Sequence, residues 1–234
     1  MKQSIFNILS NEALTDSVYK MTLAGDTSAI TAAGQFVNIQ LEGKFLRRPI
    51  SVCDYDNETL TIVYKVVGTG TEQMSAMTAG EKLDILTGLG NGYDLSLSGD
   101  KPVLLGGGVG VPPMYNLAKK LIAQGKKVSV ILGFNTKSEI FYEDEFKALG
   151  CDVTVTTVDG SYGVKGFVTN ALPEHYTYFY TCGPEPMLKA VYKATATSGQ
   201  MSFEERMGCT CKTKYGNKRI CRDGPVLQKE EIIW

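Results

Sequence analysis

The fold of the second half is decided by the stretch Val103-Leu104-Leu105-Gly106-Gly107-Gly108-Val109-Gly110-Val111-Pro112-Pro113, in which a short apolar strand leads through glycines into a helix. Four glycines within five residues remove side chains where the phosphates of a ligand would approach the backbone. The helix predicted over residues 113–123 directs free N–H groups and its positive dipole end to the same place. A tight turn alone seldom needs so many glycines, although the spacing is not G-x-G-x-x-G. The candidate nucleotide-binding residues are Gly106, Gly107, Gly108 and Gly110.

Strands and helices alternate on both sides of this stretch. Strands are predicted at residues 103–105, 128–132, 152–158 and 178–180, and helices at 113–123, 143–149 and 184–197. Such alternation indicates parallel pairing in a doubly wound sheet. We therefore expect a parallel-sheet α/β nucleotide-binding domain over residues 100–201.

The first half of the chain has a different hydrophobic period. Apolar and polar residues alternate with a period of two at residues 18–23, 36–41 and 60–66, and clusters of Gly, Asp and Asn separate these segments. Short strands at this spacing predict a small antiparallel β barrel over residues 1–99, with one helix near residues 71–77. The expected architecture is therefore a β barrel plus α/β domain, followed by a short Cys-rich C-terminal segment over residues 202–234.

A second candidate motif, Thr181-Cys182-Gly183-Pro184-Glu185-Pro186-Met187, follows the last predicted strand and opens a helix. Pro184 suits the first helical turn. The motif therefore sits at the carboxyl edge of the same sheet, where such folds bind ligands. A lone Cys182 is more often a small buried residue. Beside the glycine loop, Cys182, Gly183 and Pro184 become candidates for contacting a cofactor.

The barrel half carries two motifs suited to a pyrophosphate. They are Leu46-Arg47-Arg48-Pro49-Ile50-Ser51-Val52 and Val63-Tyr64-Lys65-Val66-Val67-Gly68-Thr69-Gly70-Thr71. Two consecutive arginines, taken alone, usually lie on a surface that is exposed to solvent. Here an arginine and a serine flank a strand, and Gly-Thr-Gly-Thr leads into a helix. Together they supply a guanidinium, hydroxyls and helix N–H groups for phosphate oxygens.

Composition narrows the class of protein. The chain has 234 residues, 24 Lys plus Arg against 25 Asp plus Glu, and a formal net charge of −1. No basic field exists to gather nucleic acid or anionic lipid, and no apolar run approaches the roughly 20 residues that span a bilayer. The N-terminal residues lack the apolar core of a signal peptide. We expect a cytoplasmic protein without nucleic-acid or membrane partners.

Cysteine and histidine usage points to one kind of metal chemistry. The single histidine, His175, lies in the predicted loop Pro173-Glu174-His175-Tyr176, where it is poorly placed for a histidine-based triad, and one histidine cannot form a multi-histidine metal site. Three of the six cysteines, Cys209, Cys211 and Cys221, fall within thirteen residues. Disulfides are improbable in a reducing cytosol, so these three predict metal or cluster ligation.

These motifs, in this order, resemble the ferredoxin-reductase family, and the resemblance covers essentially the whole chain. Its tail is similar to one branch of that family, the electron-transfer subunits of dihydroorotate dehydrogenase B. The closer match rests on residues 205–209 and 221–226 of the tail and on residues 88–93 between the two halves.

The resemblance implies a flavoprotein oxidoreductase subunit of pyrimidine biosynthesis. FAD would be held by Arg48, Pro49, Ile50, Ser51, Val63, Tyr64 and Lys65, with Gly70 and Thr71 at its phosphates. The glycine loop and Cys182, Gly183 and Pro184 would bring NAD, a diffusible substrate, to the flavin. Electrons would pass through a [2Fe–2S] cluster to a separate FMN-containing catalytic subunit that oxidises dihydroorotate, in a heterotetramer of two plus two. No residue here is placed to take a proton from dihydroorotate, so no catalytic residue is assigned.

The tail departs from the family pattern M-x-C-G-x-G-x-C-x-x-C. Here the chain runs Met207-Gly208-Cys209-Thr210-Cys211. With Cys221 this gives three thiolates in all, which cannot complete a four-cysteine site. We therefore expect that a segment between Met207 and Cys211 is missing from this sequence. Rival interpretations are a stand-alone NAD(P)H-dependent flavoprotein or ferredoxin reductase, and a zinc-bearing interaction module. Residues 132–137 lack an arginine for a 2′-phosphate, which favours NADH over NADPH despite Lys137.

Overall fold

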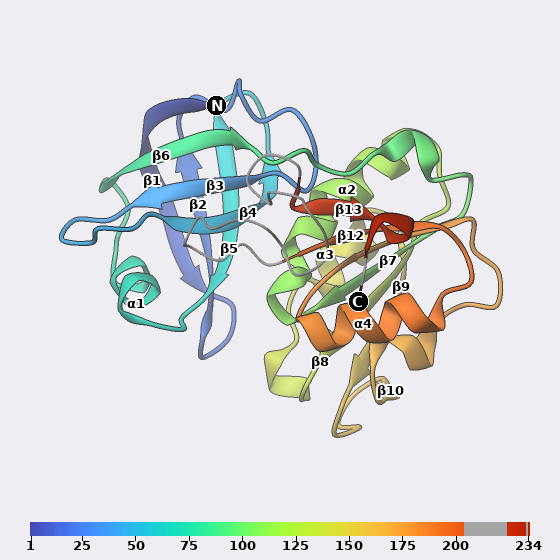
Figure 1. Cartoon of the computed structure of the whole chain (residues 1–234). Helices are drawn as coiled ribbons and strands as arrows, with labels where there is room; N and C mark the ends of the chain where they lie inside the picture. The colour runs from blue at the N-terminus through green and yellow to red at the C-terminus, as the bar shows by residue number, and fades with distance from the viewer. Residues whose placement is uncertain (204–223, 233) are drawn as a thin grey trace.

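The protein folds into a barrel and an α/β half that lie side by side (Figure 1). A computed structural model of the chain describes residues 1–203, 224–232 and 234. The first half is a closed six-stranded barrel in the order β1-β2-β5-β4-β3-β6, and the second is a seven-stranded sheet in the order β10-β9-β8-β7-β11-β12-β13. Both expected architectures are thereby confirmed.

Every neighbouring pair of strands in the barrel is antiparallel. The strands are β1 (Lys2–Ala13), β2 (Val18–Ala24), β3 (Phe36–Gln40), β4 (Arg48–Tyr55), β5 (Thr59–Lys65) and β6 (Lys82–Leu89). Alternate side chains, such as Met21 and Leu23 on β2 or Leu60 and Ile62 on β5, fill the interior. The helix α1 (Thr69–Ser75) begins two residues before the predicted position because Thr71 closes its first turn.

The second half is a doubly wound sheet with one antiparallel edge. Its strands are β7 (Pro102–Gly107), β8 (Ser129–Phe134), β9 (Asp152–Thr157), β10 (Val164–Lys165), β11 (Tyr178–Cys182), β12 (Gly199–Ser202) and β13 (Val226–Gln228). The helices α2 (Pro112–Ala123) and α3 (Glu143–Ala148) pack on one face, and α4 (Glu185–Ala194) packs on the other. No helix in the part of the chain that the structure describes is long and apolar enough to cross a membrane.

The strand β13 belongs to the predicted Cys-rich segment, yet it extends the sheet by pairing antiparallel with β12. Asn91, at the exit from the barrel, binds it from the other side. The Asn91 side chain donates to Val226 O at 2.7 Å and accepts from Val226 N at 3.2 Å, and Asn91 N donates to Gly224 O at 2.8 Å. Cys209, Cys211, Cys221 and the suspected gap after Met207 lie outside the described residues.

A polar seam joins the barrel to the α/β half. Asp54 on β4 accepts a hydrogen bond from Asn116 Nδ2 at 2.6 Å, and it forms an ion pair with Lys119 Nζ at 2.7 Å. Both partners lie on α2, the helix that begins directly after the glycine loop. The hydrogen bond that Lys119 donates to Asp54 raises the pKa of Lys119. Asp54 therefore fixes the position of α2, and with it the glycine loop, against the barrel.

The residues on either side of Asp54 extend this seam. Lys120 Nζ donates to Tyr55 Oη at 2.6 Å. Burial raises the pKa of the Cys53 thiol to about 12, so the thiol stays protonated and donates to Tyr142 Oη at 3.3 Å. Tyr142 precedes α3 in a left-handed conformation, with φ of 68°. Three consecutive residues of β4 thus bind the helix α2 and the residue that precedes α3.

We expect Asp54→Ala to lower the free energy of unfolding by about 1–3 kcal/mol, because it leaves the buried Asn116 amide without its acceptor. The matched control is Asp100→Ala, which removes an exposed ion pair to Lys126 and should cost at most about 0.5 kcal/mol. Urea unfolding of both variants measures the difference. Equal losses of unfolding free energy in the two variants would show that the seam contributes little to stability.

Candidate functional site

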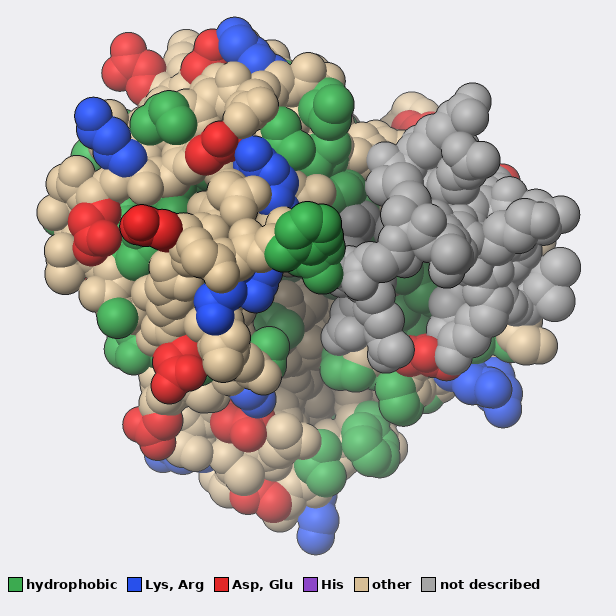
Figure 2. Space-filling view, turned by 60° about the vertical axis from the view of Figure 1, so that its left-hand side comes forward, with side chains coloured by type: hydrophobic (Ala, Val, Ile, Leu, Met, Phe, Trp, Pro, Cys, Tyr) green, Lys and Arg blue, Asp and Glu red, His purple; other side chains and the backbone are tan. Residues whose placement is uncertain are grey.

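A cavity of about 810 Å³ opens where the barrel meets the α/β half. Figure 2 shows a hollow in this face of the molecule, with hydrophobic and basic side chains at its rim. Fourteen of the residues predicted from sequence line this cavity: Arg48, Pro49, Ile50, Ser51, Val63, Tyr64, Lys65, Gly70, Thr71, Gly107, Gly110, Cys182, Gly183 and Pro184. Segments more than a hundred residues apart in the chain therefore contribute to one site.

The wall of this cavity is basic. Lys44, Arg47, Arg48 and Lys65 line it, and no Asp or Glu appears among the described lining residues. The charge of Arg47 is already paired within the protein, because Arg47 forms an ion pair with Asp84 at 2.9 Å and lowers the pKa of that carboxyl. The other three cations remain available for an anionic ligand such as a pyrophosphate.

Gly70 has a steric role beside Arg48. A Cβ at Gly70 would lie 2.1 Å from Arg48 Nε, so only glycine lets this side chain lie across the first turn of α1. The Thr71 hydroxyl, which we predicted at the phosphates, accepts from Val67 N at 2.9 Å and donates to Gly68 O at 3.0 Å. Thr71 therefore shapes the turn that lines the cavity.

The inner wall of the cavity is formed by β4 and β5. Tyr64 is buried there, and its hydroxyl donates to Asn11 Oδ1 at 3.0 Å. Burial raises the pKa of Tyr64 to about 12, so it remains a neutral donor at physiological pH. With Pro49, Ile50 and Val63, it offers a mostly apolar surface to a flat ring system.

Sequence reasoning missed several residues of this site. Lys44 Nζ donates to Thr69 Oγ1 at 2.9 Å, which places its ammonium beside the start of α1. Phe45 lines the mouth of the cavity with 97% of its surface exposed, and Phe203 approaches from the end of β12. A Gly-Lys-Phe turn carries no recognisable motif, so no signal in the sequence singles out Lys44 or Phe45.

The two motifs of the α/β half touch each other. A Cβ at Gly110 would lie 2.2 Å from Cys182 O, so the glycine loop and the loop after β11 pack backbone to backbone. Gly107 lines the cavity, whereas Gly106 packs against Val111 and lines neither cavity described here. Gly108 has no atom within 4 Å of its Cβ position, and it faces a second cavity.

This second cavity has a volume of about 570 Å³ and lies over the carboxyl ends of β7 and β8. It shares a wall with the first cavity. The residues common to both are Lys65, Val67, Gly107, Val109 and Pro184. Ligands bound in the two cavities would therefore meet at this shared wall, which is the arrangement that transfer between two cofactors needs.

The part of the chain that the structure describes contains no group of three or more metal-ligating side chains. Cys53 and Cys151 are buried at separate places, and Cys182 lines the first cavity.

Two family profiles match the chain. Residues 104–193 match the oxidoreductase NAD-binding domain, and residues 207–233 match the iron-sulfur cluster binding domain of dihydroorotate dehydrogenase B. The second match coincides with the predicted Cys-rich segment.

Curated relatives match along their whole length. The electron transfer subunit of dihydroorotate dehydrogenase B (NAD(+)) from Bacillus pumilus is 42% identical, over 99% of this chain and 98% of that protein. The subunit of the same name from Fusobacterium nucleatum is 41% identical, over 99% of both chains. The first alignment has 255 positions and this chain has 234 residues, so at least 21 of those positions lack a counterpart here.

Solved structures share the fold. An NADH-dependent reduced ferredoxin-NADP oxidoreductase is 30% identical with a TM-score of 0.87, and the match covers 98% of this chain and 90% of that one. A ferredoxin NADP+ reductase from Neisseria gonorrhoeae, with bound FAD and NADP, is 20% identical with a TM-score of 0.72 over 83% of this chain and 90% of that one. At that identity, the likeness shows the fold alone.

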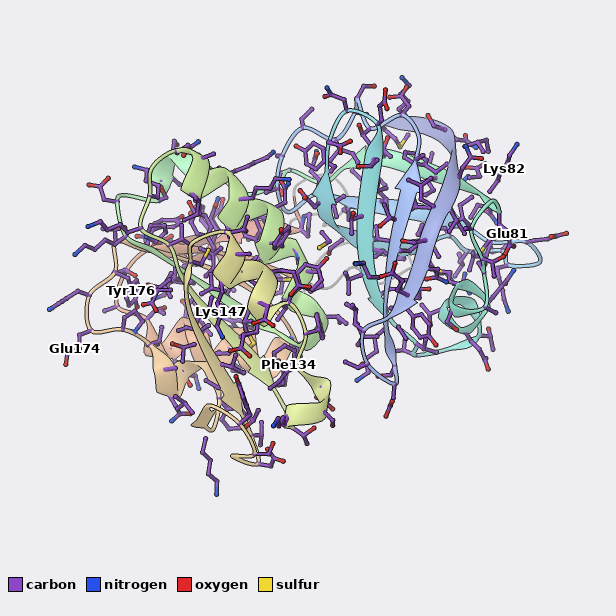
Figure 3. All side chains as sticks on the ribbon, turned by 180° about the vertical axis from the view of Figure 1, so that it is seen from behind. Glu81, Lys82, Phe134, Lys147, Glu174 and Tyr176 are labelled. Carbon is purple, nitrogen blue, oxygen red and sulfur yellow. The ribbon has the colours of Figure 1, made fainter. Side chains whose placement is uncertain are left out.

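We expect Arg48→Ala to weaken FAD binding by about 10-fold to 150-fold, because a charge-assisted contact to phosphate is lost. The control is Lys82→Ala, which removes a cation from the side of the barrel far from the α/β half (Figure 3). Flavin occupancy after extensive dialysis measures the effect. Full retention by the Arg48 variant would show that this cavity does not hold the phosphates.

Proposed function

We propose, since this chain belongs to the family of dihydroorotate dehydrogenase B electron transfer subunits, that it carries electrons between NAD and a separate catalytic subunit. FAD in the first cavity and a [2Fe–2S] cluster in the C-terminal segment would form the route. The names of the relatives and the two matching family profiles support this assignment.

The observation that carries the proposal is the shared wall of the two cavities. Lys65, Val67, Gly107, Val109 and Pro184 line both, so one nucleotide in each cavity would place reactive rings in contact. Either cavity alone could bind one nucleotide, but it would not bring a second nucleotide close enough for electron transfer between the two.

The residues present fit FAD in the first cavity. Lys44 and Arg48 bring two cations to the start of α1, where the turn closed by Thr71 presents backbone groups. The apolar surface around Ile50 suits the ring, and the absence of acidic side chains among the described lining residues suits the phosphates. When bound, FAD supplies the conversion between two-electron hydride chemistry and one-electron transfer.

The chain's own part in the transfer is binding and orientation. The glycine loop and the loop from Cys182 to Pro184 form the floor on which a nicotinamide ring would lie. Their backbones are fixed by direct contact at Gly110 and by the Asp54 seam below α2. Because this floor is held in place by both contacts, it limits the orientations that the ring can adopt.

The partner that we propose is an FMN-containing dehydrogenase subunit, in an assembly of two copies of each chain. The names of the relatives describe an electron transfer subunit, which requires a catalytic chain to exchange electrons with. The described lining of the first cavity offers no Asp or Glu that would accept a proton from dihydroorotate. Substrate oxidation therefore belongs to the partner.

The test of the function is a reconstitution. The FAD-loaded chain is mixed with the dehydrogenase subunit co-purified from native extract, and NADH formation is followed after adding dihydroorotate and NAD⁺. We expect NADH formation only when both chains are present, and we expect a stable complex at micromolar concentrations. Activity of the dehydrogenase alone, or the absence of a complex, would reject the pairing. Reduction of electron acceptors without any partner would support a stand-alone reductase. A colourless protein that contains zinc would support the interaction module.

The cysteine count bears on the cluster. A [2Fe–2S] site of this type needs four thiolates, and the tail supplies Cys209, Cys211 and Cys221. The alignment shows that the relative carries at least 21 positions absent here. We propose that the natural protein contains a further segment between Met207 and Cys211 that holds the remaining ligand.

Intact mass and iron content test this proposal on protein purified from the natural source. We expect a mass larger than the 25.5 kDa of the 234 residues and two irons per chain. A mass equal to these residues, with neither iron nor acid-labile sulfide on anaerobic assay, would contradict it.

A further inference from the structure

The second cavity contains one fixed negative charge, and the proposed function leaves this charge without a role. Glu139 ends the short helix η3 (Lys137–Glu139), and its side chain turns back toward the carboxyl end of β8. Glu139 Oε2 accepts from Asn135 N at 3.1 Å and from Asn135 Nδ2 at 2.9 Å. The carboxylate is therefore held in place directly after the strand that ends at Phe134, which is labelled in Figure 3.

The charges around the second cavity are distributed unevenly. Lys65 and Glu139 are the only charged side chains among the described residues that line it. Lys65 stands on the barrel, in the wall shared with the first cavity, whereas Glu139 lies outside that shared wall. The end of the cavity over β8 thus presents an anion and no described cation.

Lys137 does not counter this charge within the cavity. Its ammonium lies 5.7 Å from the centroid of the Tyr162 ring, and its backbone N donates to Ser161 Oγ at 2.8 Å. Lys137 is absent from the lining of the cavity, although its position in the sequence made it a candidate for binding a 2′-phosphate.

We propose that Glu139 determines the choice of NADH over NADPH, an inference that rests on the proposed function and names the residue behind its nucleotide preference. In parallel α/β sheets, the ribose of the adenosine is recognised at the carboxyl end of the second strand, which here is β8. A carboxylate accepts a hydrogen bond from a ribose 2′-hydroxyl, and it repels a 2′-phosphate that carries up to two negative charges. Glu139 therefore selects by attraction and repulsion together.

The geometry separates this role from a purely structural one. Asn135 would keep its hydrogen bonds if Glu139 were replaced by glutamine, because the amide oxygen still accepts from both Asn135 donors. Glu139→Gln therefore removes the charge while the loop after β8 retains its partner. A residue that served only to hold the loop would tolerate this change without altering nucleotide selectivity.

The experiment measures equilibrium binding of NAD⁺ and NADP⁺ to the oxidised, FAD-loaded chain by calorimetry, so no turnover is involved. For Glu139→Gln, we expect NADP⁺ to bind about tenfold more tightly or better than to the wild type, while NAD⁺ affinity changes by less than about threefold. The control is Glu174→Gln, which removes an equal charge from the loop at the edge of the α/β half in Figure 3 and should leave both affinities unchanged.

The outcomes separate the inference from the proposed function. An unchanged ratio of the two affinities in Glu139→Gln would overturn the role of Glu139, even though both nucleotides bind. A wild-type chain that binds neither nucleotide would overturn the proposed function itself. A Glu174 variant that shifts the ratio as strongly as the Glu139 variant would show that net charge is responsible, and this result would also reject the inference.

Discussion

The ion pair and hydrogen bond that Asp54 makes with α2 are the interaction on which the site depends. Asp54 is on the barrel strand β4, whose first residues line the first cavity, and α2 starts from the glycine loop that lines both cavities. One carboxylate therefore couples the positions of the two binding surfaces. The barrel and the sheet would each keep a core without it, because their buried clusters are largely separate. Their relative placement, which creates the shared wall, depends on this seam together with the packing of Val18, Cys53 and Val63 of the barrel against the apolar core of the α/β half.

Local patterns predicted much of the architecture. The period-two segments at residues 18–23, 36–41 and 60–66 are β2, β3 and β5, and the apolar run before the glycines is β7. These segments were predictable because each strand buries alternate or all side chains, which leaves a record in the sequence. β13 escaped prediction, since three residues in a Cys-rich segment form a strand only by pairing with β12. The helix α4 ends at Ala194, earlier than expected, because the chain must extend to enter β12.

Most of the candidate site was likewise predictable, whereas its long-range contacts were not. The motif residues line the cavity because glycine allows close approach to the backbone and proline fixes the backbone locally, and both residue types are visible in the sequence. The pairing of Asp54 with Asn116 joins residues 62 apart, and nothing in either segment marks them as partners. Glu139 reaches back four residues to Asn135, so its place in the cavity depends on the turn between them. Such contacts follow from tertiary geometry and leave no local pattern.

The central claim is that two nucleotides meet at the wall shared by the two cavities. A crystal structure of the FAD-loaded chain with NAD⁺ bound tests this most directly. The account predicts that the flavin ring lies against β4 and β5, that the nucleotide follows the carboxyl ends of β7 and β8, and that both contact Gly107 and Pro184. A flavin or a nucleotide bound away from this wall, so that the two rings do not meet, would contradict it.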